Sequence, residues 1–246
     1  MPRVPSGRAY EALVERGSGM TVTNEAVTRI KSMIATGELP PGSRLPSQDD
    51  LAYQLGLSRS ALREAVRSLT TMNILVSRQG DGTYVSSLRT PLLLQPLAFA
   101  ADILPDDAVV QLLDLRVALE PHAAGLAAAR VNDADVQALA SIAGRGGPGA
   151  SAADLLEADL AFHRRILELS GNEAIATLVQ AISPPALHAR ILGVAPDAGT
   201  RATIHDDHTR IIQALADHDV DAARAAVAVH ITGMRRQLRR VLAAAA

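Results

Sequence analysis

The sequence predicts a mainly α-helical chain, in which a small β-ribbon follows an N-terminal group of helices and an all-α bundle forms the C-terminal part. Apolar residues recur at helical spacing through most of the 246 residues. Strand-forming residues gather at Thr83, Tyr84 and Val85, and no strand alternation appears after residue 98. Aromatic residues make up 2% of a chain that is 48% hydrophobic. The cores must therefore consist of Ala, Leu, Val and Ile, and Ala and Leu favour closely packed helices.

Length and composition narrow the class of protein. A chain of 246 residues is long enough for two domains. It contains no cysteine, so it has no disulfide framework and suits a cytoplasmic location. We expect neither a signal peptide nor a membrane span, because no apolar stretch approaches about 20 residues. The net charge of −2 gives no overall nucleic-acid signature, so any contact with DNA must depend on local charge.

The N-terminal part is predicted to hold three helices and a ribbon within residues 21–88, after a flexible arm at residues 1–20. Helical spacing of apolar residues predicts the first helix, at Val27, Ile30, Met33 and Ile34. A capping box formed by Ser47 and Asp50 opens the second helix, which Gly56 ends.

The third helix is predicted to begin after the N-cap Ser58 and to bury an apolar face made of Leu62, Ala65, Val66 and Leu69. Asn73 tolerates the left-handed conformation that a helix exit often needs. A Gly-rich turn at residues 79–82 then leads into a short strand. Helix, turn, helix and Gly-rich ribbon, in this order, predict a winged helix-turn-helix.

Three arginines form a stripe along the third helix. Arg59, Arg63 and Arg67 are spaced at i, i+4 and i+8, on a side away from the apolar face. Such a stripe can contact phosphates or pair with guanine, and the helix N-terminus itself favours a phosphate. The Gly80 turn, flanked by Arg78 and Gln79, can approach the DNA backbone closely. The alternative is a solvated basic face, which is common on surface helices.

The stretch PPGSRLPSQDDLAYQLGLSRSALREAVRSL, followed by GDGTYV, resembles the N-terminal domain of GntR-type bacterial transcription regulators over residues 23–86. The resemblance implies DNA contacts from Arg59, Ser60, Arg63 and the wing at Gly80, and a homodimer on a pseudo-palindromic double-stranded operator. The motif and the resemblance together give these candidate DNA-binding residues: Arg44, Ser58, Arg59, Ser60, Arg63, Arg67, Gln79 and Gly80.

One departure from the GntR pattern concerns the second helix. The family usually has Glu-Arg after the Pro-Ser that opens this helix, and that arginine commonly contacts DNA. Here the two positions are Gln48 and Asp49. An acidic residue beside a phosphate is repelled, so the docking or the operator sequence is expected to differ from the family pattern. Arg44, just upstream, is a candidate substitute.

Residues 89–98 carry two prolines and read as a linker to an all-α domain at residues 99–246. The expected helices in this domain span residues 106–130, 133–143, 152–170, 172–192, 200–217 and 220–242.

Four residues of this domain are candidate metal ligands. Asp159 and His163 lie at i and i+4 on one predicted helix, and His208 and His230 lie in the last two. One carboxylate with three imidazoles suits zinc, nickel, manganese or iron, and leaves one or two coordination positions open. Each histidine taken singly is more often a core or surface residue, and spacing cannot show that three helices converge.

Residues 99–243 also resemble the all-helical FCD effector domain of the FadR-like subfamily. The pattern D-x-x-x-H, then S-G-N, then H-x-x-I and a final histidine is that domain's metal-site signature, and Asp159, His163, His208 and His230 fill it. The resemblance implies a divalent metal, foremost zinc, and a small carboxylate effector that completes its coordination. Arg116 would pair with the effector's carboxylate, with Arg190 a weaker candidate. A salt bridge from Arg116 to Glu120 is the alternative.

These observations predict an effector-controlled transcription regulator, and repression is the common outcome in the family. A regulator that senses the metal alone is a second reading. A metalloenzyme joined to a DNA-binding domain is a third, because a metal with open positions can activate water. The sequence has no H-E-x-x-H motif and no second carboxylate spaced to act as a base beside His163, so we do not expect an enzyme.

Overall fold

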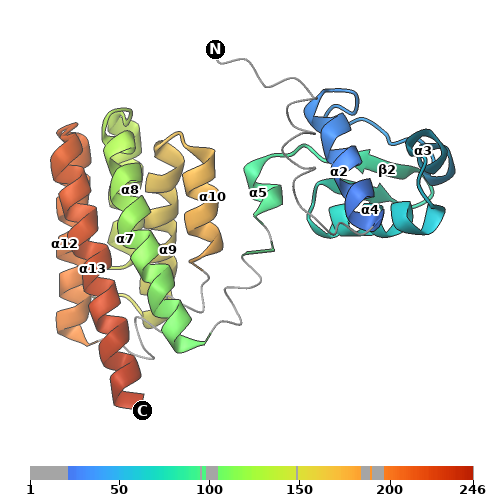
Figure 1. Cartoon of the computed structure of the whole chain (residues 1–246). Coiled ribbons are helices and arrows are strands. Elements are labelled where there is room, and N and C mark those ends of the chain that lie inside the picture. The colour runs from blue at the N-terminus through green and yellow to red at the C-terminus, as the bar shows by residue number, and fades with distance from the viewer. Residues whose placement is uncertain are drawn as a thin grey trace. The chain divides into compact units, whose positions relative to one another are not determined.

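The computed structural model describes residues 22–94, 96–97, 105–147, 149–183, 189 and 197–245. The chain divides into two compact units, with the boundary between Leu93 and Leu94. Figure 1 shows a small unit with a β-ribbon and a larger unit of long helices. The expected N-terminal arm and the effector candidate Arg190 lie outside the described residues.

The N-terminal unit is a winged helix-turn-helix. Its helices are α2 (Val22–Ala35), α3 (Gln48–Leu55), α4 (Arg59–Thr71) and the one-turn α5 (Thr90–Leu93), and its antiparallel ribbon pairs β1 (Leu75–Arg78) with β2 (Gly82–Val85). Leu75 lies opposite Val85, and Arg78 lies opposite Gly82. The core joins α2, α3, α4 and both strands through buried aliphatic side chains, including Ile30, Leu51, Leu62, Leu69 and Leu75.

The local signals of this unit produce the elements that they predict. The hydroxyls of Ser47 and Ser58 accept backbone N–H groups in the first turns of α3 and α4, which satisfies donors that a helix start leaves open. Gly56 ends α3 at φ 64°, and Asn73 follows α4 at φ 57°, both in the left-handed region. The predicted apolar face of α4 is fully buried.

The C-terminal unit is a helical bundle in its described part (Figure 1). Its helices are α7 (Asp106–Ala128), α8 (Asp133–Arg145), α9 (Ala152–Leu169), α10 (Glu173–Ala181), α12 (Ala198–Ala216) and α13 (Val220–Ala245). α13 packs along α7 and α12, and α8 packs on α9 and α12. Many core residues on α7, α12 and α13 are alanines, which let the helices approach closely.

Two expectations about the helical elements need correction. The helix expected over residues 172–192 ends at Ala181, because the Pro184-Pro185 pair that follows cannot donate the helical hydrogen bonds and disfavours a helical residue before it. The expected linker contains α5, where Pro91 lies in the first turn, a position that tolerates proline. No helix among the described residues is long and apolar enough to cross a membrane.

Candidate DNA-binding surface and metal centre

The eight candidate DNA-binding residues all lie on the N-terminal unit, and all are exposed. Arg59, Arg63 and Arg67 point away from the core side of α4, since Leu62, Val66 and the other apolar residues of this helix are buried. Ser58 and Ser60 lie at the N-terminal end of the helix, with their hydroxyl oxygens 3.2 Å apart. α4 therefore offers a cationic stripe and its own N-terminus on one surface.

Ion pairs distinguish the three arginines of α4. Arg67 lies 3.2 Å from Glu64, and Arg59 lies 3.2 Å from Asp49. Arg63 makes no ion pair within the described part of the chain. The Arg59–Asp49 pair involves the position in α3 where this sequence has Asp49 in place of the arginine usual in the GntR pattern. Arg59 neutralises the negative charge of Asp49. Exposed pairs are weak, so a phosphate can replace Asp49 as the partner of Arg59.

The wing is the turn between β1 and β2. Gly80 has φ 73° and Gly82 has φ 138°, conformations that favour glycine. A Cβ atom on Gly82 would lie 2.8 Å from Nε of Arg44, so glycine leaves room for this candidate DNA contact. The backbone of Arg44 also bridges to Tyr84, which ties the loop before α3 to the ribbon. Arg44 and the wing thus form one continuous edge of the unit.

The second candidate site, the metal centre, consists of Asp159 and His163 on α9, His208 on α12 and His230 on α13. All four side chains are buried, with exposed fractions of 1–4%. One donor atom from each residue can be chosen so that all four lie within 4.8 Å of one another. The packing of three helices thus brings together the four residues that the sequence pattern proposed.

The distances fit a single small cation. Oδ1 of Asp159 lies 3.7 Å from Nε2 of His163, 3.3 Å from Nε2 of His208 and 3.8 Å from Nε2 of His230. The Nε2 atoms of His163 and His230 are 3.1 Å apart. Ligands bound at about 2.0–2.2 Å from one ion lie about 3–4 Å from each other. The donor set and its spacing therefore suit a divalent transition metal.

The surroundings of His208 fix the position of its ring and favour its neutral form. Its ring stacks on Phe162, with ring centroids 4.1 Å apart and planes 23° apart. Burial lowers the pKa of His208, and the carboxylate of Asp159 opposes this only in part. The imidazole is thus mostly neutral at pH 7, and neutral imidazole is the form that binds a metal.

Two further carboxylates contact the metal centre from outside. Nδ1 of His163 lies 2.8 Å from Oε2 of Glu120 on α7, and Nδ1 of His230 lies 3.3 Å from Oδ2 of Asp207 on α12. Sequence reasoning did not place either carboxylate at the site. Asp207 had one available signal, because it directly precedes His208.

Arg116 is fully buried and forms an ion pair with Glu120. Burial raises the pKa of the Glu120 carboxyl, but the charge of Arg116 and the contact with His163 outweigh it and hold that pKa well below its ordinary value. The salt bridge that the sequence offered as the alternative role of Arg116 is therefore present. The effector-binding role of Arg116 remains a prediction.

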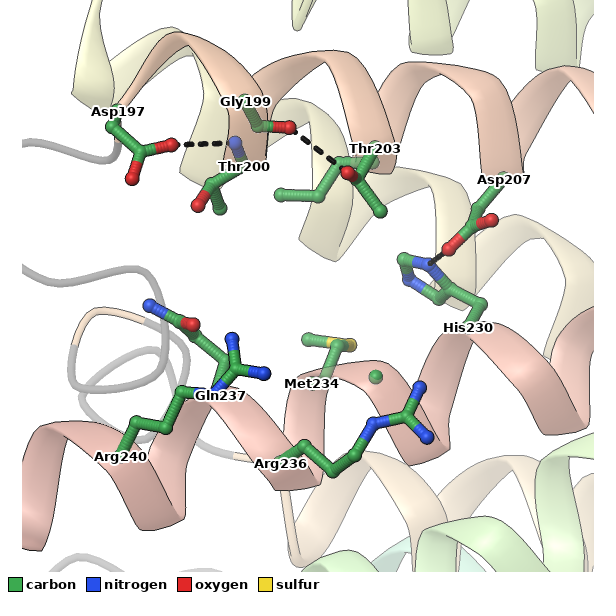
Figure 2. Close-up of a pocket in the computed structure, with 12 residues that line it drawn as sticks. Asp197, Gly199, Thr200, Thr203, Asp207, His230, Met234, Arg236, Gln237 and Arg240 are labelled. Atoms are coloured by element: carbon green, nitrogen blue, oxygen red, sulfur yellow. Dashed lines mark hydrogen bonds and ion pairs between the residues drawn. The ribbon is translucent and has the colours of Figure 1, made fainter.

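A groove of about 380 Å³ between α12 and α13 reaches the metal centre at His230 and Asp207. Figure 2 shows Thr200 and Thr203 on one wall and Met234 on the other. Arg236, Gln237 and Arg240 of α13 also line this groove. Neither arginine makes an ion pair with the residues that the structure describes. The groove thus extends from the edge of the candidate metal centre to two arginine side chains.

A winged helix-turn-helix with an exposed arginine stripe, joined to a helical unit with a buried ligand-type site, defines a DNA-binding transcription regulator. Comparison with known families identifies its kind. Residues 22–85 match the bacterial regulatory proteins of the gntR family, and residues 111–233 match the FCD domain. The chain belongs to the GntR family of regulators with an FCD domain, and it is a regulator rather than an enzyme.

Individual relatives agree with this family. The chain is 33% identical over 207 residues to the HTH-type transcriptional regulator LutR of Bacillus subtilis, covering 82% of this chain and 94% of LutR. It is 27% identical over 231 residues to the putative L-lactate dehydrogenase operon regulatory protein of Escherichia coli, covering 89% and 87%. The solved structure of Streptococcus agalactiae GntR covers 87% of this chain and 99% of its own, with 33% identity and a TM-score of 0.60.

Proposed function

We propose that this regulator is a homodimeric repressor whose operator affinity is set by a small carboxylate bound to a divalent metal in the helical unit. The observation that carries this proposal is the metal centre, where one carboxylate and three imidazoles converge in a buried space with the spacing of metal ligands. Such a donor set buried without a cation would bring an ionised carboxylate and several ring nitrogens together at a cost.

The metal that we propose is zinc first, with nickel, manganese and iron as alternatives, because all four accept imidazole and carboxylate ligands. Asp159, His163, His208 and His230 would hold it. When bound, the ion supplies one or two open coordination positions and a positive charge that attract the carboxylate of an effector.

The groove between α12 and α13 supports a small anionic effector. Its volume of about 380 Å³ falls within the range of small-molecule sites. Arg236 and Arg240 would attract an anion toward the groove, and Thr203 offers a hydroxyl along its wall. The Escherichia coli relative is named as a putative regulator of an L-lactate dehydrogenase operon. Small 2-hydroxy acids are therefore the first compounds to test.

Control of DNA binding requires an effector that distinguishes two states of the dimer. A ligand with equal affinity for both states would not change operator binding. The arginine stripe of α4 and the wing would contact each half of a pseudo-palindromic operator. Release of the operator on effector binding is the expected direction, which the GntR family resemblance favours.

The test is an operator titration with three preparations of the full chain: chelator-treated, zinc-loaded, and zinc-loaded with a panel of small carboxylic acids. The operator is first selected from random double-stranded DNA, and affinity is then measured by fluorescence anisotropy at fixed salt. We expect one acid to weaken binding by tenfold or more only when zinc is present. An operator affinity that depends on zinc but on no acid would indicate a metal sensor instead.

A further inference from the structure

We infer that Glu120 and Asp207 are positioning residues, which fix the tautomers of His163 and His230 so that both rings present Nε2 to one metal ion. This inference rests on the proposed metal centre and extends it to residues that do not bind the ion themselves. Each carboxylate contacts the Nδ1 side of one ring, at 2.8 Å for Glu120 and 3.3 Å for Asp207.

The chemistry of neutral imidazole explains how these contacts determine which ring nitrogen can bind a metal. A neutral ring carries a proton on one nitrogen and a lone pair on the other. A carboxylate accepts and does not donate, so Glu120 and Asp207 place the protons of both rings on Nδ1. Both Nε2 atoms then carry lone pairs, and these atoms lie 3.1 Å apart in the buried centre. Two lone pairs at this distance repel each other, and a cation bound between them would remove this repulsion.

The two carboxylates are supported in different ways. Glu120 is buried between Arg116 and His163, so its charge has a fixed counter-ion on the same helix. Asp207 lies at the inner end of the groove and also pairs with the exposed Arg210, at 3.0 Å. We therefore expect Glu120 to hold His163 more rigidly than Asp207 holds His230. The longer contact of Asp207 agrees with this order.

This arrangement gives α7 a part in the metal centre without contributing a ligand. The chain Arg116–Glu120–His163 runs from a buried cation on α7 to a ligand on α9. A substitution at Glu120 therefore reaches the metal through the orientation of one ring, and it also removes the counter-ion of Arg116. Because breaking a buried ion pair by changing one side alone destabilises a fold strongly, Glu120 has to be tested together with Arg116.

The experiment compares the full chain with Asp207→Ala, Asp207→Asn and the double variant Arg116→Met/Glu120→Leu, which removes both the acceptor and the buried charges. Zinc affinity is measured by competition with a chromogenic chelator, with no organic acid present. We expect 10- to 100-fold weaker zinc binding for Asp207→Ala and for the double variant. Asp207→Asn keeps an acceptor oxygen and should recover part of the loss. Asp135→Asn is the control, because its carboxylate pairs with Arg165 and has a similar exposed fraction, 16% against 10%.

A second measurement separates positioning from a general effect on the fold. Long-range proton–nitrogen NMR spectra of the metal-free protein report which ring nitrogen carries the proton. We expect Nδ1–H forms for His163 and His230 in the wild type, and loss of the fixed form for His230 alone in Asp207→Ala. Zinc affinities within twofold of wild type, or unchanged tautomers in the variants, would overturn the inference and leave the metal centre standing. A wild-type chain that binds no zinc, nickel, manganese or iron would overturn both.

Discussion

The two units place their functional residues in opposite ways. In the N-terminal unit, the candidate DNA contacts are exposed and most come from a single helix and the ribbon that follows it. In the C-terminal unit, the candidate metal ligands are buried and come from three helices, and the first and the last are 71 positions apart in the sequence (159 to 230). We therefore expect the candidate DNA-binding surface to tolerate the loss of a side chain without loss of the fold, whereas a ligand lost from the candidate metal centre should lower the stability of the fold.

The largest effect is expected from His208→Ala, which removes one of four ligands from a buried site. Metal content should fall from about one ion per chain to nearly none, because the remaining ligands leave the ion incompletely held. Stabilisation by added zinc, which reaches about 4 kcal/mol at a thousandfold excess over Kd, should also disappear. Elemental analysis and thermal unfolding with and without zinc measure both quantities.

The control for this variant is His122→Ala, an exposed histidine on α7 outside the metal centre. It should keep full metal content and the full stabilisation by zinc. Full occupancy in His208→Ala itself would show that these four residues are not the metal site.

Arg63→Ala, on the exposed stripe of α4, is expected to weaken operator binding and to leave the stability of the fold unchanged. Loss of a base or phosphate contact worth about 1–3 kcal/mol should weaken operator binding by roughly 10- to 100-fold. The melting temperature should not change, since Arg63 is exposed and makes no ion pair with the described residues. Fluorescence anisotropy titration measures the operator affinity, and thermal unfolding followed by circular dichroism measures the melting temperature.

Arg29→Ala is the matched control, because Arg29 is an exposed arginine on α2 that pairs with Glu25 at 2.7 Å. Operator affinity should stay close to wild type in this control. If Arg63→Ala also binds as the wild type does, the assignment of α4 as the recognition helix is wrong.

The two units also differ in how far the sequence alone predicts them. The helix caps at Ser47 and Ser58 and the left-handed conformation of Asn73 depend on residues close to them in the sequence. The elements of the winged unit could therefore be predicted from local sequence signals. The metal ligands were proposed from a pattern, and only the packing of α9, α12 and α13 brings them within reach of one ion.

The outer carboxylates were missed for a related reason. Glu120 showed a spacing that predicted a pair with Arg116, which the structure contains, but its contact with His163 joins residues 43 positions apart (120 to 163). No local pattern carries such a contact. The same limit explains the helix end at Ala181, where a continuous apolar pattern masked the effect of the proline pair that follows.

A smaller effect is expected in the groove between α12 and α13. Arg236→Gln/Arg240→Gln should weaken binding of the acid effector by roughly two- to tenfold, since exposed charges contribute modestly. The effect should shrink at high salt. Arg239→Gln is the control, because Arg239 is exposed on the same helix and does not line the groove. Equal effector affinities in the double variant and the control, measured by calorimetry, would exclude the groove as the effector's path.

The smallest effect is expected from Ser58→Ala, which removes the cap of α4 and so links stability to function within the DNA-binding surface. The Ser58 hydroxyl accepts the backbone N–H of Ala61 at 3.2 Å. Its loss should cost about 1 kcal/mol and raise hydrogen exchange in the first turn of α4. Ser58→Thr keeps the hydroxyl and should remain close to wild type. Unchanged exchange in Ser58→Ala would contradict the capping role.

Native mass spectrometry of the purified full chain, with elemental analysis of the same sample, tests the central claim most directly. The account predicts a dimer that carries about one divalent ion per chain, which a chelator removes and zinc restores. A dimer that takes up no ion after incubation with zinc, nickel, manganese or iron would contradict it. Asp159, His163, His208 and His230 would then be structural residues, while the DNA-binding surface of α4 would be unaffected.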